Sequence, residues 1–209
     1  MKKDRRQEQS GSISLPRTTT SDLRGKQSVR ATFKLTVGCI DAISIVATHL
    51  GIKQKSLFDH LVEDSRSLNA IAREIQNVRL KTQSRIQKTF VISRKSLSSL
   101  DKVAKNFNAP RDALVEFSVQ RLLPIIAMER EKHKMRKQTL DDIARHFKDG
   151  TKLLNKIKDQ LGDEDPIYHK LETVMKVYEN AYLNIEDFID KGKIIEDFEP
   201  EDLEQIFAI

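Results

Sequence analysis

The chain of 209 residues contains an internal repeat. Residues 32–62 align with residues 89–119 at a constant spacing of 57 positions and without a gap. Few paired residues are identical, but the apolar positions coincide nearly throughout. The matching pairs are Phe33 with Phe90, Leu35 with Ile92, Ile40 with Leu97, Ile43 with Leu100, Val46 with Val103, Ala47 with Ala104, Leu50 with Phe107, Leu57 with Leu114 and Val62 with Val119. A pattern of this kind indicates two copies of one supersecondary unit.

Each copy changes its hydrophobic period partway through. Residues 31–36 and 88–93 roughly alternate between apolar and polar, as a strand with one buried face does. The residues that follow place apolar side chains at positions i, i+3, i+6, i+7 and i+10, which predicts a helix with one buried face. Thr36 and Ser93 stand at the change of period, where a side-chain oxygen can cap the first helical N–H groups.

A tight turn and a second helix complete each copy. Gly51 and Asn108 occupy equivalent positions after the first helix, and these two residue types best tolerate the left-handed conformation that ends a helix. Pro110 follows, and proline suits the first turn of a helix. A unit of strand, helix, turn and helix in about 35 residues is too small to bury a core alone, so each copy needs the other.

This arrangement resembles the ribbon-helix-helix (MetJ/Arc/CopG-like) family of bacterial DNA-binding proteins. The resemblance is carried by Thr32–Val62 and Thr89–Val119, about a third of the chain. In that family two copies intertwine, and their strands pair into an antiparallel ribbon that enters the major groove of DNA. Two copies within one polypeptide are similar to a TraY-like architecture.

The resemblance implies a mainly α fold: a tandem ribbon-helix-helix pseudo-dimer with two short antiparallel strands and four helices. We expect this domain at residues 29–128, with repeat 1 at 29–63, a helical connector at 64–85 and repeat 2 at 86–128. The second helix of repeat 1 is expected to continue toward Leu80. That expectation comes from the 3-4-3 spacing of Leu68, Ile71, Ile75 and Val78.

Two apolar seams after the repeats predict an antiparallel helical hairpin of coiled-coil type at residues 129–190. We expect Pro124 to interrupt the preceding helix, and Gly162–Pro166 to form the turn of the hairpin. The first seam is Leu140, Ile143, Phe147, Gly150, Leu154, Ile157 and Leu161. The second seam is Ile167, Leu171, Val174, Tyr178, Ala181, Ile185 and Phe188. Residues 191–209 form an acidic C-terminal tail with a short helix after Pro200, and the sequence leaves open whether it folds onto the hairpin or binds a partner.

Charge is distributed unevenly along the chain. Residues 1–162 hold 33 Lys and Arg against 17 Asp and Glu, a net charge of +16, whereas residues 163–209 hold 4 against 14, a net charge of −10. The basic residues 1–162 favour a polyanionic partner, and the acidic residues 163–209 indicate a different function for that part of the chain. Residues 1–28 are basic and polar, and we expect a disordered tail. The alternative is a basic arm that contacts the DNA backbone or a partner.

Several function classes find no support in the sequence. There is no phosphate-binding glycine loop and no Cys–His pair in a nucleophile context, so we expect no enzyme and no cofactor. His169 and Glu172 match half of a di-metal motif, but no second copy exists, so we expect no metal. No apolar run approaches membrane-spanning length, no secretory signal follows the basic start, and Cys39 is the single cysteine. These features predict a cytoplasmic protein.

The outward positions of the two predicted strands are the candidate base readers. If the repeats pair as in the family, Phe33, Leu35, Phe90 and Ile92 face the core. Arginine and lysine suit guanine acceptors, glutamine suits adenine, and threonine or valine methyl groups suit the thymine methyl. The candidate base-contacting residues are Arg30, Thr32, Lys34, Gln87, Thr89 and Val91. The alternative is that these are ordinary solvent-facing strand residues.

The starts of the two second helices are the candidate phosphate contacts. A helix N-terminus carries free N–H groups and the positive end of the helix dipole, both of which suit a phosphate. Such contacts position a protein on DNA without specifying sequence. The candidates are Lys53, Gln54, Lys55 and Arg111. The alternative is simple surface charge.

These observations predict a sequence-specific protein that binds double-stranded DNA, either a transcriptional repressor or a factor in plasmid maintenance or transfer. We expect the C-terminal helical region to mediate self-association or to bind a protein partner, with no membrane involved. One alternative is an antitoxin-like protein whose C-terminal region binds a protein partner. Another is a helical scaffold that never contacts nucleic acid.

Overall fold

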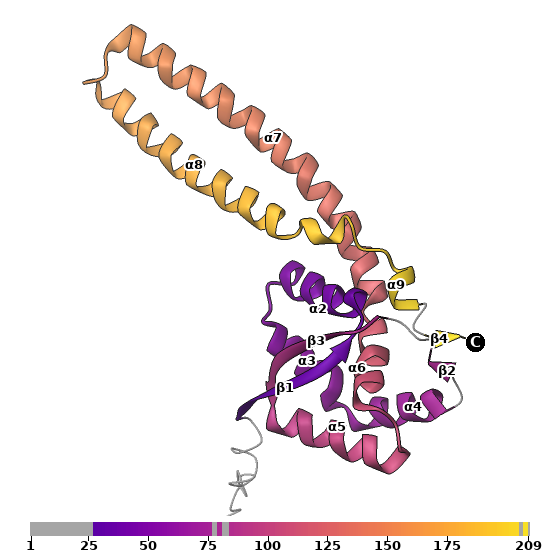
Figure 1. The fold of residues 1–209 in the computed structure, drawn as a ribbon. Helices are drawn as coiled ribbons and strands as arrows, with labels where there is room; N and C mark the ends of the chain where they lie inside the picture. The colour runs from indigo at the N-terminus through magenta and orange to yellow at the C-terminus, as the bar shows by residue number, and fades with distance from the viewer. Residues whose placement is uncertain (1–26, 77–78, 81–83, 205–206, 209) are drawn as a thin grey trace, which may run out of the picture.

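The computed structural model describes residues 27–76, 79–80, 84–204 and 207–208, and it is mainly helical. Its central element is an antiparallel ribbon of β1 (Ser28–Leu35) and β3 (Ile86–Ser93) (Figure 1). Thr32 lies directly opposite Thr89, and these two residues are equivalent positions of the sequence repeat. The pairing is therefore symmetric about that pair. Of the predicted N-terminal tail only Gln27 and Ser28 belong to the described part, and Ser28 begins β1.

The helices of the two repeats begin at equivalent positions. In repeat 1 they are α2 (Val37–His49) and α3 (Gln54–Glu63), and in repeat 2 they are α5 (Arg94–Phe107) and α6 (Arg111–Gln120). Each helix of repeat 2 begins 57 residues after its counterpart, so strand, first helix and second helix follow in the same order twice.

The local signals at the helix ends are confirmed. The Thr36 hydroxyl accepts a hydrogen bond from the Cys39 N–H (3.3 Å), and the Ser93 hydroxyl accepts one from the Ser96 N–H (3.0 Å). Gly51 (φ 63°) and Asn108 (φ 48°) both adopt the left-handed conformation. Asn108 is the one non-glycine residue with positive φ in the described ranges.

The two repeats share one hydrophobic core. Phe33 of β1, Phe58 of α3 and Phe90 of β3 form an aromatic cluster with ring centroids 5.1–6.5 Å apart. All three side chains are buried. Moreover, α3 packs against β3 and α6 packs against β1, so each second helix covers the strand of the other repeat. Neither repeat could bury these side chains alone.

Two carboxylates, the half-buried Asp59 and the fully buried Glu116, connect the repeats. Asp59 Oδ1 of α3 accepts a hydrogen bond from the Ser93 N–H (2.7 Å), and Glu116 Oε1 of α6 accepts one from the Thr36 N–H (3.0 Å). Asp59 and Glu116 are equivalent in the repeat, as are Thr36 and Ser93. Each second helix therefore binds the N-cap residue of the first helix in the other repeat. Arg85 also pairs with Glu116 (3.0 Å).

The prediction of one continuous helix from repeat 1 toward Leu80 was wrong. α3 ends at Glu63, and a separate helix, α4 (Ser65–Gln76), follows. The Asp64 carboxylate accepts hydrogen bonds from the Arg66 N–H (3.0 Å) and the Ser67 N–H (3.4 Å), which starts a new helix at this point. α4 packs on α5 and α6, where it buries Leu68, Ala72 and Ile75. Beyond it, β2 (Arg79–Leu80) pairs with β4 (Phe207–Ala208).

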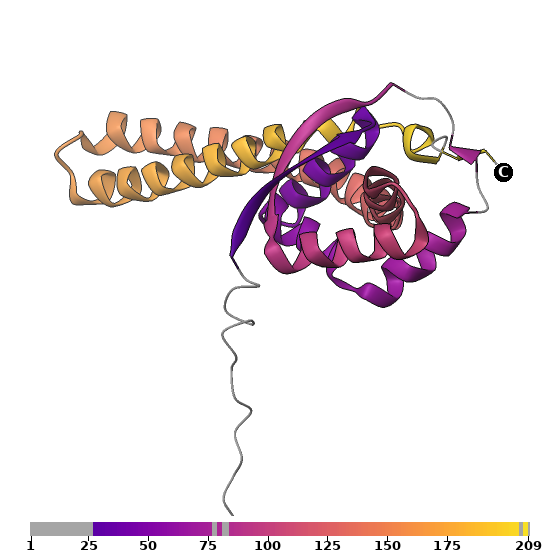
Figure 2. The ribbon, with the colours of Figure 1, turned by 60° about the horizontal axis from the view of Figure 1, so that its bottom comes forward.

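A long hairpin of α7 (Leu123–Leu161) and α8 (Pro166–Lys191) projects away from the ribbon and its helices (Figure 2). Its first arm begins at Leu123, not at residue 129 as predicted. The reason is that Pro124 lies in the first turn of α7, where its missing N–H costs nothing. Gly162 (φ 86°) ends α7 within the predicted turn.

The face of α8 that packs against α7 differs from the predicted seam. Phe147 of α7 stacks on Tyr178 and Tyr182, with ring centroids 5.6 Å and 6.1 Å apart. Gly150 lies so close to Met175 that an added Cβ would be 2.8 Å from the sulfur. Val174, by contrast, is 57% exposed. The contacting face is therefore rotated toward Met175 and Tyr182, relative to the predicted seam through Val174 and Ala181.

The acidic C-terminal segment packs across the base of the hairpin. It contains the 3-10 helix η1 (Lys193–Ile195) and the short helix α9 (Glu201–Glu204), which begins after Pro200 as predicted. Ile195, Phe198 and Leu203 are buried, and α9 packs against α2 and α6. The sequence left open whether this segment folds onto the hairpin or binds a partner. In the structure residues 193–204 pack onto the folded body.

Candidate nucleic-acid interface

All six candidate base-contacting residues lie on the exposed face of the ribbon. They form three directly opposed pairs: Arg30 with Val91, Thr32 with Thr89, and Lys34 with Gln87. Each of the six side chains is exposed, whereas the residues that alternate with them include the buried Phe33, Leu35, Phe90 and Ile92. One face of the ribbon therefore builds the core, and the other presents these six side chains to solvent.

A hydrogen bond joins the two strands at the centre of this face. The Thr32 and Thr89 hydroxyl groups are 2.9 Å apart. Each threonine keeps its methyl group and retains hydrogen-bonding capacity at its hydroxyl, so this central pair can still meet both polar and apolar groups.

The ribbon face presents different side chains on either side of the threonine pair, Arg30 beside Val91 at one end and Lys34 beside Gln87 at the other. Both positive charges, Arg30 and Lys34, belong to β1, whereas β3 offers Gln87 and the 44% exposed Val91. The backbone is symmetric about the central pair, but its outward side chains are not. The face can therefore make unlike contacts on its two sides.

Three of the four candidate phosphate contacts also have partners within the chain. Gln54 donates to the Ser44 hydroxyl (3.1 Å), Lys55 pairs with Asp59 (2.7 Å) and Arg111 pairs with Asp101 (2.9 Å). Lys53 is exposed at the N-cap of α3 and makes no side-chain cap. The salt bridges with Asp59 and Asp101 therefore hold the side chains of Lys55 and Arg111 in position in the absence of a ligand.

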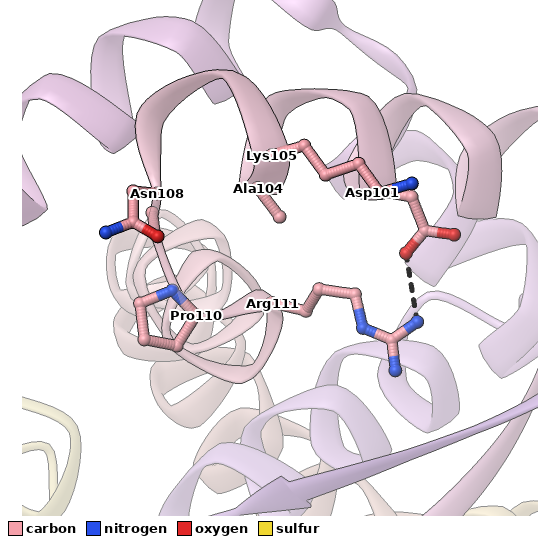
Figure 3. A pocket seen from close by; sticks show the side chains of 7 residues that line it. Asp101, Ala104, Lys105, Asn108, Pro110 and Arg111 are labelled. Atoms are coloured by element: carbon pink, nitrogen blue, oxygen red, sulfur yellow. Dashed lines mark hydrogen bonds and ion pairs between the residues drawn. The ribbon is translucent and has the colours of Figure 1, made fainter.

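Arg111 lies beside the ribbon. Its guanidinium carbon is 5.8 Å from the centroid of the Phe33 ring of β1, so the start of α6 is near the strand. Figure 3 shows Arg111 and Asp101 on the rim of an open pocket of about 500 Å³ after the turn at Asn108 and Pro110. The pocket is lined by Asp101, Ala104, Lys105, Asn108, Ala109, Pro110 and Arg111.

Asp59 connects the start of α3 to the ribbon. Burial by itself would raise the pKa of its carboxyl group, but hydrogen bonds from Lys55, from the Ser93 N–H and from Ser96 outweigh that effect. Together they hold the pKa of Asp59 below its ordinary value of 3.8. Asp59 is therefore charged at neutral pH and holds Lys55 near the N-terminus of α5.

Two exposed cations next to the ribbon were missed in the sequence analysis. Lys88 lies two residues before the buried Phe90 and so belongs to the core-facing side of β3, but its own side chain is exposed near the start of the strand. Arg94 is exposed at the first residue of α5, and its N–H donates to the Gln27 carbonyl (2.9 Å). The repeat contained the signal, because Lys88 aligns with Ala31 and Arg94 aligns with Val37. Where one repeat has a charged residue and the other has an apolar one, the side chain at that position is not needed in the shared core.

A buried polar cluster joins α2 to the base of the hairpin. His49 of α2 and His133 of α7 meet edge to face, with ring centroids 5.4 Å apart. His49 Nδ1 accepts from Arg136 (3.1 Å), so its Nε2 carries the proton and donates to the Gly192 carbonyl (3.1 Å). His133 Nε2 is 2.8 Å from Glu196. Burial lowers the pKa of His49 below its ordinary value of 6.5, and the charge of Arg136 lowers it further.

We expect the free energy of unfolding to fall as the pH is lowered from about 7.5 to about 5.5. The unfolded chain binds a proton at His49 more readily than the folded chain, so this contribution is complete above pH 6.5 and is lost as the pH falls below it. Urea unfolding at both pH values measures the effect. His49→Gln should reduce the pH dependence, because it removes the titrating imidazole. An equal pH dependence in wild type and His49→Gln would contradict the assignment.

Comparison of the chain with protein-family models, curated proteins and solved structures gives no match. The ribbon-helix-helix interpretation therefore rests on the residues of this chain alone. No helix in the described part of the chain is long and apolar enough to cross a membrane.

Proposed function

We propose that this chain is a sequence-specific protein that binds double-stranded DNA, with a tandem ribbon-helix-helix pseudo-dimer that inserts its ribbon into the major groove. The observation that carries the proposal is the exposed face of the β1–β3 ribbon, with its three opposed pairs of side chains. The major groove admits a two-stranded β-ribbon. A solvent-facing ribbon above a core shared by both repeats is a rigid way to present such side chains.

The side chains of this face suit base edges. Arg30 and Lys34 can donate to the O6 and N7 acceptors of guanine, and Gln87 can pair with adenine. Thr32, Thr89 and Val91 offer methyl groups that suit the thymine methyl. Arg30 lies at one end of the ribbon beside Val91, and Lys34 lies at the other end beside Gln87. We therefore expect one G·C contact in each half of the site, with unlike neighbouring contacts in the two halves.

Charge around the ribbon supports a polyanionic ligand. Residues 27–128 hold 16 Lys and Arg against 8 Asp and Glu. The helix starts at Lys53, Gln54 and Arg111 can supply N–H groups and positive charge to phosphates, while Lys55 is held close by through Asp59. These contacts would orient the protein on the duplex, and the ribbon would read the sequence.

In this proposal the protein acts as a transcriptional repressor or as an accessory factor in plasmid maintenance or transfer. The antitoxin-like alternative needs a C-terminal segment available to a partner. Residues 193–204 instead pack against the body, and the Arg130 guanidinium donates to the Ile195 and Phe198 carbonyls. That observation favours DNA binding through the ribbon over masking of a partner by the acidic tail.

Selection of bound sequences from a random DNA pool, followed by mobility-shift assays, tests the proposal. Arg30→Ala and Lys34→Ala should each weaken specific binding by about 1–3 kcal/mol, or roughly 5- to 150-fold, because a base contact is lost. Each should relax the preference only in its own half of the site, so the wild-type consensus should not be a palindrome. Gln87→Ala should act in the same half as Lys34→Ala, because these two residues are directly opposed.

Lys148→Ala and Lys156→Ala are matched controls, because both residues are exposed lysines on the hairpin and not on the ribbon. They should leave affinity and consensus unchanged. Equal losses in the ribbon and hairpin variants would mean that charge alone drives binding. A symmetric consensus affected in both halves by Arg30→Ala would show that the two halves of the ribbon do not read separately.

A further inference from the structure

One side of α8 carries a stripe of apolar side chains that α7 leaves exposed, apart from the Arg136 guanidinium, whose carbon is 5.4 Å from the centroid of the Phe188 ring. The stripe consists of Ile167, Val174, Val177, Ala181, Ile185 and Phe188, all of them exposed. The exposed fractions are 57% for Ile167 and Val174 and 65% for Val177. At about 100° per residue these positions fall within an arc of about 80°, next to the face that packs on α7. We call this set the α8 stripe.

The α8 stripe is nearly free of charge. Lys170 is the single charged residue of α8 within the same arc, whereas its acidic residues, such as Glu172 and Glu179, fall on other sides of the helix. Interface cores are depleted of charged residues in this way. A helix face that only meets water has no need for such an arrangement along most of its length.

The neighbouring surface of α7 continues the stripe. The stripe is rotated by about 100° from the residues of α8 that pack on α7. In an antiparallel pair of helices, the same rotation in the same sense on the partner helix leads to the same side of the hairpin. On α7 the residues on that side include Met135 (57% exposed) and Leu153 (50% exposed). Lys148 falls on the opposite side, whereas the exposed Asp142, Asp149 and Lys156 fall within about 60° of Met135 and Leu153. This face of the hairpin therefore combines the apolar α8 stripe with an α7 surface in which Met135 and Leu153 alternate with charged residues.

We infer that this face of the hairpin binds the same face of a second copy of the chain, so that two hairpins form a four-helix bundle. The hairpin projects away from the ribbon and its helices, so a second hairpin can approach it from the side (Figures 1 and 2). α8 has 26 residues and is about 39 Å long, and two helices side by side are about 20 Å wide. Such a face has about 780 Å², close to the roughly 800 Å² per partner of a stable interface.

A second hairpin fits this face better than the N-terminal segment of the same chain does. Residues 1–26 contain only four large apolar residues, Met1, Ile13, Leu15 and Leu23, and they lack helical spacing. A second hairpin instead offers an α8 stripe of the same length and with the same single charged residue, Lys170. Closed two-fold association of identical surfaces is also the commonest form of assembly in soluble oligomers.

Light scattering of the full-length protein without DNA tests the inference. The wild type should have twice the mass of the 24.1 kDa chain at tens of micromolar. Val177→Glu places a charge in the middle of the α8 stripe and should give a single-chain mass. Lys176→Glu changes the neighbouring exposed residue outside the stripe and should keep the dimer. Because Val177 is exposed, circular dichroism should show equal helix content in all three proteins.

Each other outcome overturns the inference. A wild-type protein with single-chain mass would show that no second copy covers the face. A monomer that becomes a dimer when residues 1–26 are removed would assign the face to the N-terminal segment. A dimer that persists in Val177→Glu would place the interface elsewhere. The measurement contains no DNA, so its failure would leave the proposed DNA binding untouched.

Discussion

Replacing Phe33 by alanine should lower the free energy of unfolding by about 3–5 kcal/mol, because the change removes a fully buried aromatic ring from a packed core. Phe33 is 1% exposed and contacts Phe58 and Phe90, with ring centroids 5.3 Å and 6.5 Å away. These three rings come from both repeats. The loss should therefore destabilise the two repeats together, in one transition followed by circular dichroism in urea.

Val91→Ala is the matched control for this experiment. Val91 belongs to the same ribbon, but its side chain is on the exposed face. Its replacement should cost no more than about 1 kcal/mol, the range of intrinsic strand preferences. A loss below 1 kcal/mol for Phe33→Ala, or two separate transitions for the two repeats, would contradict a shared core.

Raising the salt concentration fourfold, from about 50 mM to about 200 mM, should weaken DNA binding by about 150-fold. Exposed cations near the ribbon include Arg30, Lys34, Lys53, Lys88 and Arg94. If about four phosphates are neutralised, the slope of log K against log salt is about −3.6, because each contact releases condensed counterions. Mobility-shift or fluorescence titrations over this range measure the slope.

Single substitutions separate phosphate contacts from general charge. Lys53→Ala, at the start of α3, should make the slope less negative by about 1 and weaken all DNA sequences equally. Lys156→Ala, on the hairpin, should leave the slope unchanged. A binding constant that does not respond to salt would be incompatible with a basic body that contacts phosphates.

The features that could be predicted from sequence are those set by residues close together in the chain. Thr36 and Ser93 cap helices three residues ahead, and the left-handed turns at Gly51 and Asn108 depend on the residue type at one position. Because the chain contains two copies of the unit, each of these local signals occurs twice, at equivalent positions. The exposure of the six outward ribbon residues followed from strand alternation, because a strand with one buried face must expose the other.

The contacts between the repeats could not be predicted in this way. Asp59 binds Ser93 across 34 positions, and Glu116 binds Thr36 across 80. In the sequence both carboxylates are ordinary polar residues of amphipathic helices. Only the crossing of each second helix onto the other repeat gives each carboxylate an N–H group to bind, and it buries Glu116 completely.

The hairpin shows a different limit of sequence reasoning. Apolar residues cover nearly half of the circumference of α8, so two neighbouring sets of positions fit a 3-4 spacing. The predicted seam passes through Val174, whereas α7 packs against the set of residues through Met175, where Gly150 makes room for the sulfur. The complementary shape of two helices made that choice.

Local periodicity and single residue types specify the two repeated units, the ends of their helices and the outward side chains of the ribbon. Tertiary packing places Thr32 opposite Thr89, binds Asp59 and Glu116 to the opposite repeat, and joins the acidic C-terminal segment to the body. These features depend on which surfaces meet in space. A local hydrophobic pattern shows that a surface must be covered, and the tertiary packing determines which other surface of the chain covers it.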